Sequence, residues 1–276
     1  MTTQTTSTSA ASPPAAVRPR LDLKAPLIRL GYFLIGLFIL ALIWTVLAAV
    51  RSDLPNLATV GGSLAELFRN PWYVNGPNDK GILNLLLSSL TRVFAGFSLG
   101  ALIAIPLGIL IGSVPVLRRI CDPIVQLLRP VSPLAWFPIG LTLFQSAEPA
   151  TVFIITITAL WPTVINTAFG VSNVPQDFKN VARVFKFSPT QYVTRVLWPY
   201  ALPYIVTGLR VSFGIAWMVI VAAEMLSGKS GIGFFVWDAW NALNLPHVVS
   251  AILVIGVTGL LFDQLFGWLE RKVSYV

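Results

Sequence analysis

Charged side chains are scarce in this chain. Asp, Glu, Lys and Arg together account for 11% of its 276 residues, whereas an ordinary soluble domain has about 25%. Hydrophobic residues account for 55%, and the mean hydropathy is +0.77. A soluble protein of this length needs much more polar surface, so we expect lipid rather than water to contact most of the outside of the protein.

Cysteine and histidine are nearly absent as well. Cys121 is the only cysteine and His247 the only histidine. These counts exclude an intrachain disulfide, a cysteine metal cluster and a multi-histidine metal site. Because an enzyme needs convergent nucleophiles, acids or metal ligands, they also argue against a membrane enzyme. We expect no metal site, and an ordinary packing role for His247.

The net charge of +8 could indicate a nucleic-acid partner, but the basic residues are scattered and form no polar face. In membrane proteins, lysine and arginine gather in the cytoplasmic loops. We therefore predict that the chain contacts membrane lipid and no nucleic acid.

Six apolar stretches are long enough to cross a membrane, which takes about 20 mostly apolar residues. They run from Leu30 to Val50, about Leu85 to Leu117, about Cys121 to Phe144, about Pro149 to Val171, about Tyr200 to Met225 and about Pro246 to Trp268. The sequence therefore predicts an all-α, polytopic membrane protein. Residues 1–24, rich in Thr, Ser, Ala and Pro, are predicted to form a disordered cytoplasmic tail, and residues 25–276 a transmembrane domain.

The basic residues also predict the orientation. If the N-terminus is cytoplasmic, Arg51, Arg69, Lys80 and Lys229 fall outside, and three arginines lie within spans. The remaining twelve of the 19 lysines and arginines fall inside. This asymmetry follows the positive-inside rule and predicts that both termini are cytoplasmic.

Small residues and prolines shape two of the predicted spans. The second span carries small residues at every fourth position, namely Gly96, Gly100, Ala104, Gly108 and Gly112. Such a row lets helices approach closely in lipid, which favours tight packing within one subunit over a subunit interface or a pore wall. The third span contains Pro130, Pro133 and Pro138. They predict a kinked helix whose freed backbone groups face either protein or a water-filled cavity.

The segment from Ser172 to Pro199 is predicted to form two short cytoplasmic helices, the first from about Pro175 through Arg183. Before the second, Ser188 suits the N-cap, Pro189 the first helical position and Gln191 the reciprocal bond of a capping box. With its basic residues this segment is typical of a docking element. The alternative is an amphipathic connector that rests on anionic lipid.

The same segment resembles the coupling loop of importer permeases of ATP-binding-cassette (ABC) transporters. That loop has the pattern Glu-Ala-Ala, three residues, Gly, nine residues, Ile-x-Leu-Pro. This chain keeps the spacing with Asn180-Val181-Ala182, then Lys186, then Val196-Leu197-Trp198-Pro199. Ala182 and Pro199 match outright, whereas Asn180 stands for Glu, Val181 for Ala, Lys186 for Gly and Trp198 for Leu.

The flanking residues are similar to the permeases for nitrate, sulfonate, taurine and bicarbonate. Similar stretches are Gly100 to Gly112, Ala201-Leu202-Pro203, Gly208-Leu209-Arg210 and Ala222 to Leu226. The stretch from Gly231 to Asn241 is most similar to the cyanobacterial-type nitrate and bicarbonate members. The resemblance covers about residues 85–269.

The resemblance implies a type I importer-like fold and a multi-subunit machine in a bacterial inner membrane. Two copies of this chain would form a homodimer, two cytoplasmic ATPase subunits would clasp the loop, and an external binding protein would deliver the substrate. The residues that would couple to the ATPases are Asn180, Val181, Ala182, Arg183, Lys186, Ser188 and Pro199. ATP and Mg would be bound by the partner subunits, so this chain carries no cofactor.

The chain has no phosphate-binding loop of its own. Gly228-Lys229-Ser230 imitates the end of such a loop, but the glycine required five positions earlier is Ala223. The sequence therefore predicts a transporter subunit that is not itself an ATPase.

Lys186 occupies the turn where the family pattern has glycine. Glycine tolerates a left-handed backbone, whereas another residue costs roughly 1 kcal/mol there. We therefore expect either a right-handed turn, or a left-handed Lys186 that a partner contact stabilises.

Aromatic residues crowd the stretch from Gly228 to Leu245, which is predicted to lie outside and to meet the binding protein. We expect an apolar face formed by Phe234, Phe235, Trp237 and Trp240. Asp238 and Asn241 are expected on the side exposed to water. Of these, the predicted docking residues are Phe235, Trp237, Asp238 and Trp240. The alternative is a helix that rests at the lipid interface.

Charged side chains inside spans are costly and usually functional. Arg210 lies about 15 Å into the fifth span, and Arg92 and Arg129 lie within the second and third. Carboxylates are predicted nearer the membrane edges, so the central field leans positive, which suits a small anion. Arg210, Arg92 and the uncharged Asn166 are the candidate substrate-pathway residues. The alternative is that each arginine ties helices together through a carboxylate, which we favour above all for Arg129.

The substrate predicted from the resemblance is nitrate or nitrite, imported by alternating access. Bicarbonate is the alternative, followed by sulfonates. A proton-coupled secondary carrier is disfavoured, because such carriers often consist of paired inverted halves and no such repeat is visible.

Overall fold

The computed structural model describes residues 24–51 and 53–274. The chain divides into two compact units, residues 1–53 and residues 54–276. The predicted disordered tail lies outside the described residues, except for Lys24, with which the first helix begins.

In the first unit the described residues form one long helix, α1 (Lys24–Val50). Its stretch from Gly31 to Val50 is apolar enough to cross a membrane, and 0% of that stretch is buried within the chain. Large side chains such as Phe38 and Leu40 are exposed along it. A helix that is hydrophobic on all sides is typical of a membrane span, so the first predicted span is confirmed.

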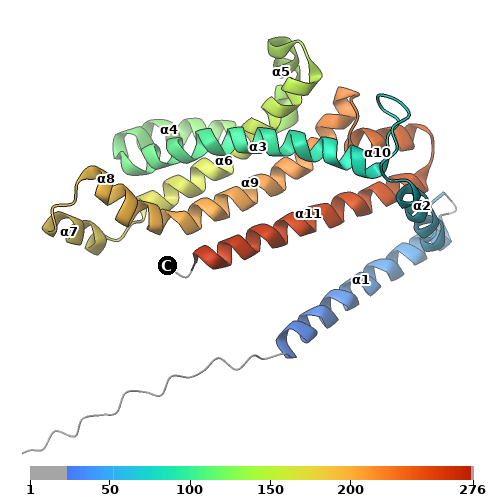
Figure 1. Ribbon diagram of the computed structural model, residues 1–276, viewed down its shortest axis with the longest axis horizontal. Coiled ribbons are helices and arrows are strands. Elements are labelled where there is room, and N and C mark those ends of the chain that lie inside the picture. The colour runs from blue at the N-terminus through green and yellow to red at the C-terminus, as the bar shows by residue number, and fades with distance from the viewer. Residues whose placement is uncertain (1–23, 52, 275–276) are drawn as a thin grey trace, which may run out of the picture. The chain divides into compact units, whose positions relative to one another are not determined.

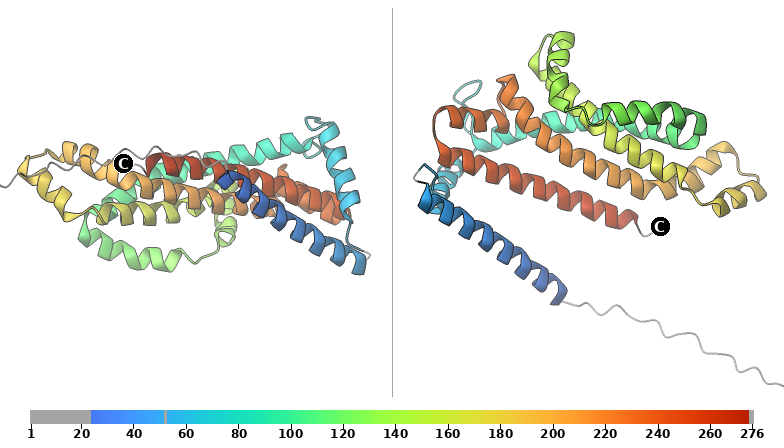
Figure 2. Two further views of the ribbon diagram at one scale, coloured as in Figure 1. Left: turned by 90° about the horizontal axis from the view of Figure 1, so that it is seen from below. Right: turned by 180° about the vertical axis from the view of Figure 1, so that it is seen from behind.

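Four long helices form the body of the second unit. They are α3 (Ile82–Ser113), α6 (Ala147–Ser172), α9 (Trp198–Ser227) and α11 (Leu245–Val273). Each is long and apolar enough to cross a membrane. They lie side by side along most of their length (Figures 1 and 2). The second, fourth, fifth and sixth predicted spans are therefore confirmed, to within a few residues at each end.

The third predicted span is two helices rather than one. The helix α4 (Pro115–Leu128) is followed by a 3₁₀ turn, η1 (Pro133–Trp136), and by α5 (Phe137–Phe144). The two parts meet at 93°, and Figure 1 shows α5 projecting sideways from the long helices. Pro130 and Pro133 lack the N–H groups that would continue the helix. The expected single helix is therefore wrong, and the described residues contain five helices able to span a membrane, or six if the bent pair is one span.

Short elements gather at the two ends of the long helices (Figure 1). At one end, which we call the coupling end, lie α7 (Gln176–Val184), α8 (Pro189–Tyr192) and the π-helical turn η2 (Val193–Leu197). Since η2 continues directly into α9, the second predicted short helix is the beginning of the fifth span. At the opposite end, which we call the α10 end, α2 (Leu57–Arg69) and α10 (Ile232–Asn241) pack against α11.

The small-residue row of α3 packs against α6. A Cβ atom on Gly100 would lie 2.8 Å from the carbonyl oxygen of Thr156 and 2.9 Å from the Cβ of Ala159. A Cβ atom on Gly108 would lie 2.6 Å from the Cβ of Thr167. The backbones are therefore too close for larger residues, which confirms the predicted packing within one subunit.

Aromatic rings hold α3, α9 and α11 together. Phe213 on α9 is 2% exposed, and its ring centroid lies between 4.8 and 5.4 Å from four others. These rings belong to Phe94 and Phe97 on α3 and to Phe262 and Phe266 on α11. Such pairs add about 0.5–1.5 kcal/mol each beyond the burial of their area.

The close approach of α3 to α6 predicts the effect of one added methyl group. Gly100→Ala should lower the thermal unfolding midpoint in detergent, because overpacking costs about 1–3 kcal/mol and outweighs a helix-propensity gain of about 1 kcal/mol. The matched control is Gly214→Ala on α9, where a Cβ atom meets nothing within 4 Å, so that the midpoint should hold or rise. Equal midpoints for the two variants would contradict this account of the packing.

Candidate functional site

The loop at the coupling end has the two-helix structure expected from its capping residues. The Ser188 Oγ accepts a hydrogen bond from the N–H of Gln191 at 3.3 Å, and the Gln191 Oε1 accepts one from the N–H of Ser188 at 2.9 Å. This reciprocal pair is the predicted capping box. It fixes the direction in which the chain leaves the loop toward α9.

Lys186 is left-handed, with φ of 51°. The Lys186 N–H donates to the carbonyl of Arg183 at 3.0 Å, and the Phe187 N–H donates to that of Ala182 at 2.9 Å. This pair of bonds is the Schellman motif that closes a helix. The expected right-handed turn is wrong. The motif explains why glycine suits this position, and the alternative of a stabilising partner contact stays a prediction.

The predicted coupling residues differ in exposure. Ala182 is 6% exposed and packs inside the loop, so it is not available to a partner. Asn180, Val181, Arg183, Lys186 and Ser188 are exposed, and Pro199 is half-buried at the start of α9. Four exposed apolar side chains lie on and just after α7, namely Phe178, Val181, Val184 and Phe185. We call these four residues the loop apolar face; Val184 and Phe185 are 77% and 70% exposed.

At the α10 end, the helix α10 buries one side and exposes the other. Trp237, Asp238 and Trp240 are exposed, together with Asn241. Phe235 instead is half-buried in the core and lies 6.0 Å from the ring of His247. The expected single aromatic face is therefore wrong, because the inward-facing side of α10 takes Phe235 from it.

The loop before α3 contains a tyrosine, Tyr73, whose pKa is shifted by its surroundings. Burial and the neighbouring Asp79 carboxylate raise the pKa of Tyr73 above its usual value. The phenol therefore stays neutral over a wider range of pH than a free tyrosine.

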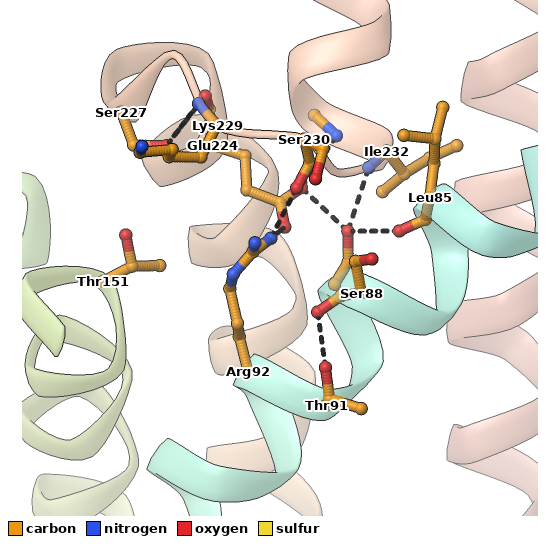
Figure 3. Close-up of polar contacts among 12 residues, drawn as sticks. Leu85, Ser88, Thr91, Arg92, Thr151, Glu224, Ser227, Lys229, Ser230 and Ile232 are labelled. Atoms are coloured by element: carbon orange, nitrogen blue, oxygen red, sulfur yellow. Dashed lines mark hydrogen bonds and ion pairs between the residues drawn. The ribbon is translucent and has the colours of Figure 1, made fainter. Parts of the chain in front are cut away.

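A buried carboxylate organises the α10 end (Figure 3). Glu224 on α9 is 0% exposed. Its Oε1 accepts a hydrogen bond from Arg92 Nη1 at 2.9 Å, and its Oε2 accepts from Ser89 Oγ at 2.8 Å and from the Gly233 N–H at 2.9 Å. Arg92 also reaches the carbonyl of Ser230 at 2.7 Å. These contacts join α3, α9 and the start of α10, and we call them the Glu224 cluster.

Arg92 is further paired with Glu148 at the start of α6, where Nε lies 3.2 Å from the Glu148 Oε1. The side chain of Glu148 is 61% exposed and that of Arg92 is 10% exposed. Arg92 therefore meets two carboxylates, and it connects α3 to the ends of both α6 and α9.

Arg210, like Arg92, is paired with two carboxylates. Its Nε and Nη2 each lie 2.9 Å from an oxygen of Asp263, and its Nη1 lies 2.8 Å from the Glu270 Oε2. Glu270 also accepts a hydrogen bond from Thr207. The expectation that Arg210 is uncompensated is wrong, because two carboxylates of α11 face it. The expected positive field at the centre of the spans is also wrong for Arg92, because Glu148 and Glu224 neutralise its charge.

The third predicted pathway residue, Asn166, lies on α6 and donates to the carbonyl of Pro162 at 2.8 Å. It lines a cavity of about 230 Å³ together with Arg129.

The Gly228-Lys229-Ser230 stretch, which imitates a phosphate-binding loop in sequence, follows the end of α9, with Gly228 as a left-handed C-cap. The sequence analysis did not identify Ser89 as a partner of Glu224, Glu148 as a partner of Arg92, or Glu270 as a partner of Arg210. The sequence indicates only that these residues lie near the ends of spans.

Comparisons with known proteins now assign the class. A family described as "Binding-protein-dependent transport system inner membrane component" matches residues 104–275. A chain of the inward-facing MetNI methionine ABC transporter superposes with a TM-score of 0.62, at 17% identity, over 70% of this chain and 95% of that chain. A chain of an amino acid ABC transporter gives a TM-score of 0.56, over 69% and 92% of the two chains at 17% identity. The protein belongs to the permease family of ABC importers and has the type I importer fold.

Within this family, two kinds of relative stand out. The nitrate import permease protein NrtB of Synechocystis is 46% identical over 240 residues, which is 87% of each chain. The bicarbonate transport system permease protein CmpB of Synechococcus elongatus is 44% identical over 241 residues, again 87% of each chain. The predicted resemblance is therefore confirmed, and the two substrates are matched almost equally.

The Glu224 cluster predicts a large loss of stability when the carboxylate is removed. Glu224→Ala removes the buried carboxylate that Arg92, Ser89 and the Gly233 N–H share, and it leaves Arg92 with only the exposed carboxylate of Glu148. Breaking a buried ion pair in this way costs about 3–5 kcal/mol. Its thermal unfolding midpoint in detergent should fall far below that of Asp122→Ala. The latter breaks only the half-exposed Arg118–Asp122 pair of 3.6 Å, worth about 0–1 kcal/mol. Equal unfolding midpoints for the two variants would show that the Glu224 cluster does not stabilise the α10 end.

Proposed function

We propose that this chain is the membrane subunit of an ABC importer that moves nitrate into the cytoplasm. The observation that carries the proposal is the loop at the coupling end, because a closed two-helix element with an exposed apolar face is built to bind another protein. The membership of the permease family and the similarity to nitrate permeases support it. We expect ATP and Mg on partner ATPase subunits.

The loop apolar face would be the ATPase contact. Phe178, Val181 and Val184 follow each other at intervals of three residues, so they lie on one side of α7, and Phe185 extends the same surface. Burying these side chains in a groove of the ATPase would favour association. Because η2 joins the loop to α9 without a break, a movement of the loop would be transmitted directly to a spanning helix. Two copies of the chain would receive two ATPases.

At the other end, the exposed residues Trp237, Asp238 and Trp240 of α10 would receive the binding protein. The Glu224 cluster supports this role, since it fixes the start of α10 to α3 and α9. A rigid α10 would let the docked binding protein act on the spanning helices. In this arrangement the coupling end and both termini face the cytoplasm.

Two variants separate the partners. Phe185→Asp should abolish copurification of the ATPase subunits that accompany the wild-type chain, because it places a charge in an apolar contact. It should leave binding-protein docking unchanged. Asp238→Lys should weaken docking of the binding protein by about tenfold or more through charge reversal and leave the ATPases bound. Each variant is the control for the other. Copurification of ATPase with Phe185→Asp at the wild-type level would remove the loop apolar face from the interface.

Bicarbonate is the second candidate substrate, because the bicarbonate permease CmpB is 44% identical. Nitrate and bicarbonate are both planar oxyanions with one negative charge, so one permease lining suits either of them. The choice is then made where affinity is highest, in the external binding protein.

The complete complex in lipid vesicles, with its binding protein outside, tests the substrate. We expect ATP-dependent uptake of labelled nitrate, and much weaker uptake of labelled bicarbonate and taurine. Vesicles loaded with a non-hydrolysable ATP analogue are the control and should take up none of the three. Uptake of bicarbonate without nitrate would replace the proposed substrate, and uptake of neither oxyanion would refute the proposed function.

A further inference from the structure

Arg129 is the exception among the three arginines within the predicted spans. Arg92 and Arg210 each face two carboxylates. The guanidinium of Arg129 has no hydrogen bond or ion pair with any residue in ranges 24–51 and 53–274, and it is exposed. It follows the last residue of α4, where the chain breaks before turning into η1.

This break opens a cavity of about 230 Å³ beside α6 and α9. Arg129, Val131 and Pro133 form the side that belongs to the broken span, and Trp161 and Asn166 of α6 lie on another side. Val211 and Ile215 of α9 complete it. We call this cavity the Arg129 pocket.

The Arg129 pocket lies near the middle of the long helices. Trp161 is about 21 Å from the start of α6 and about 17 Å from its end, at 1.5 Å per residue. Val211 and Ile215 are about 20 Å and 26 Å from the start of α9. Two helices therefore agree that the pocket is at mid-membrane depth.

The polar groups of the pocket suit an anion. The Arg129 guanidinium offers a planar fork of N–H donors that matches an oxyanion. The indole N–H of Trp161 has no partner among the described residues, and the Asn166 amide supplies further donors. No aspartate or glutamate lines the pocket. Since one water takes about 30 Å³ in the liquid, the pocket has room for a small oxyanion with a partial hydration shell.

An exposed guanidinium at this depth is costly against lipid. The face of the chain that carries Arg129 therefore meets water or protein. We propose that the Arg129 pocket is the site that holds the oxyanion midway across the membrane, with Arg129 and Trp161 as its donors. This inference rests on the proposed function. It assigns the role expected of Arg92 and Arg210 to the third span arginine, whose guanidinium has no partner among the described residues.

The test compares the reconstituted complex carrying Arg129→Gln, Arg129→Lys or Trp161→Phe with the wild type. ATP-driven uptake of nitrate, or of bicarbonate if that is the ion transported, is measured per assembled complex. Arg129→Gln should lower uptake by about tenfold or more, the range for losing a charge-assisted hydrogen-bonded pair. Arg129→Lys should be intermediate, because lysine keeps the charge and loses the planar fork. Trp161→Phe should lower uptake by about threefold, as one neutral N–H is lost.

The control is Arg118→Gln near the start of the same helix, where the side chain is half-exposed and paired with Asp122. Its uptake should equal that of the wild type. ATP hydrolysis, assembly and the thermal unfolding midpoint should be unchanged in Arg129→Gln. This readout separates an anion site from an ion pair with a second copy of the chain, since loss of such a pair would lower assembly and uptake together.

Two results would overturn the inference: unchanged uptake per complex in Arg129→Gln, or a fall in uptake that only follows a fall in assembly. Failure of the proposed function is distinct, because then the wild-type complex itself imports neither oxyanion.

Discussion

A charged side chain inside a membrane is costly unless protein or water solvates it, and Glu224, Arg92 and Arg210 meet this requirement with partners on other helices. Glu224 is fully buried, and three donors from α3 and α10 satisfy it. Removing a buried ion from water costs several kcal/mol, so α3, α9 and α10 are held in the one arrangement that supplies all these donors. The short helix α10 thereby has a fixed position although it is only ten residues long.

Arg210 satisfies the same requirement nearer the opposite end, through Asp263 and Glu270 of α11. Asp263 takes the fork formed by its Nε and Nη2, Glu270 takes its Nη1, and the negative charges of both carboxylates repel a passing anion. Pairing of this kind ties helices together and removes Arg92 and Arg210 from consideration as primary anion sites. Arg129, which has no side-chain partner among the described residues, is distinguished from the other two span arginines because carboxylates neutralise them.

Close packing joins the long helices, whereas the break in the third span leaves a cavity beside them. The row of small residues on α3 brings its backbone against α6, and the phenylalanine cluster joins α9 and α11 to α3. This packing adds to the charge pairs in holding the long helices together. The prolines of the third span interrupt the regular packing at Pro130 and Pro133, and the Arg129 pocket beside α6 lies at this interruption. The continuous column from α8 through α9 connects the coupling end to this cavity.

The amino-acid sequence by itself determined the spanning helices, the capping box at Ser188, the small-residue row and the family. Each depends on residues within about one or two helical turns or on a spacing along the chain, so local chemistry suffices to predict it. The tertiary structure alone decided the charge pairs, because Arg92 and Glu224 are 132 residues apart and Arg210 and Glu270 are 60 residues apart. It also decided the 93° bend and the inward position of Phe235. These features depend on which surfaces meet in space, and a hydropathy pattern carries no information about that.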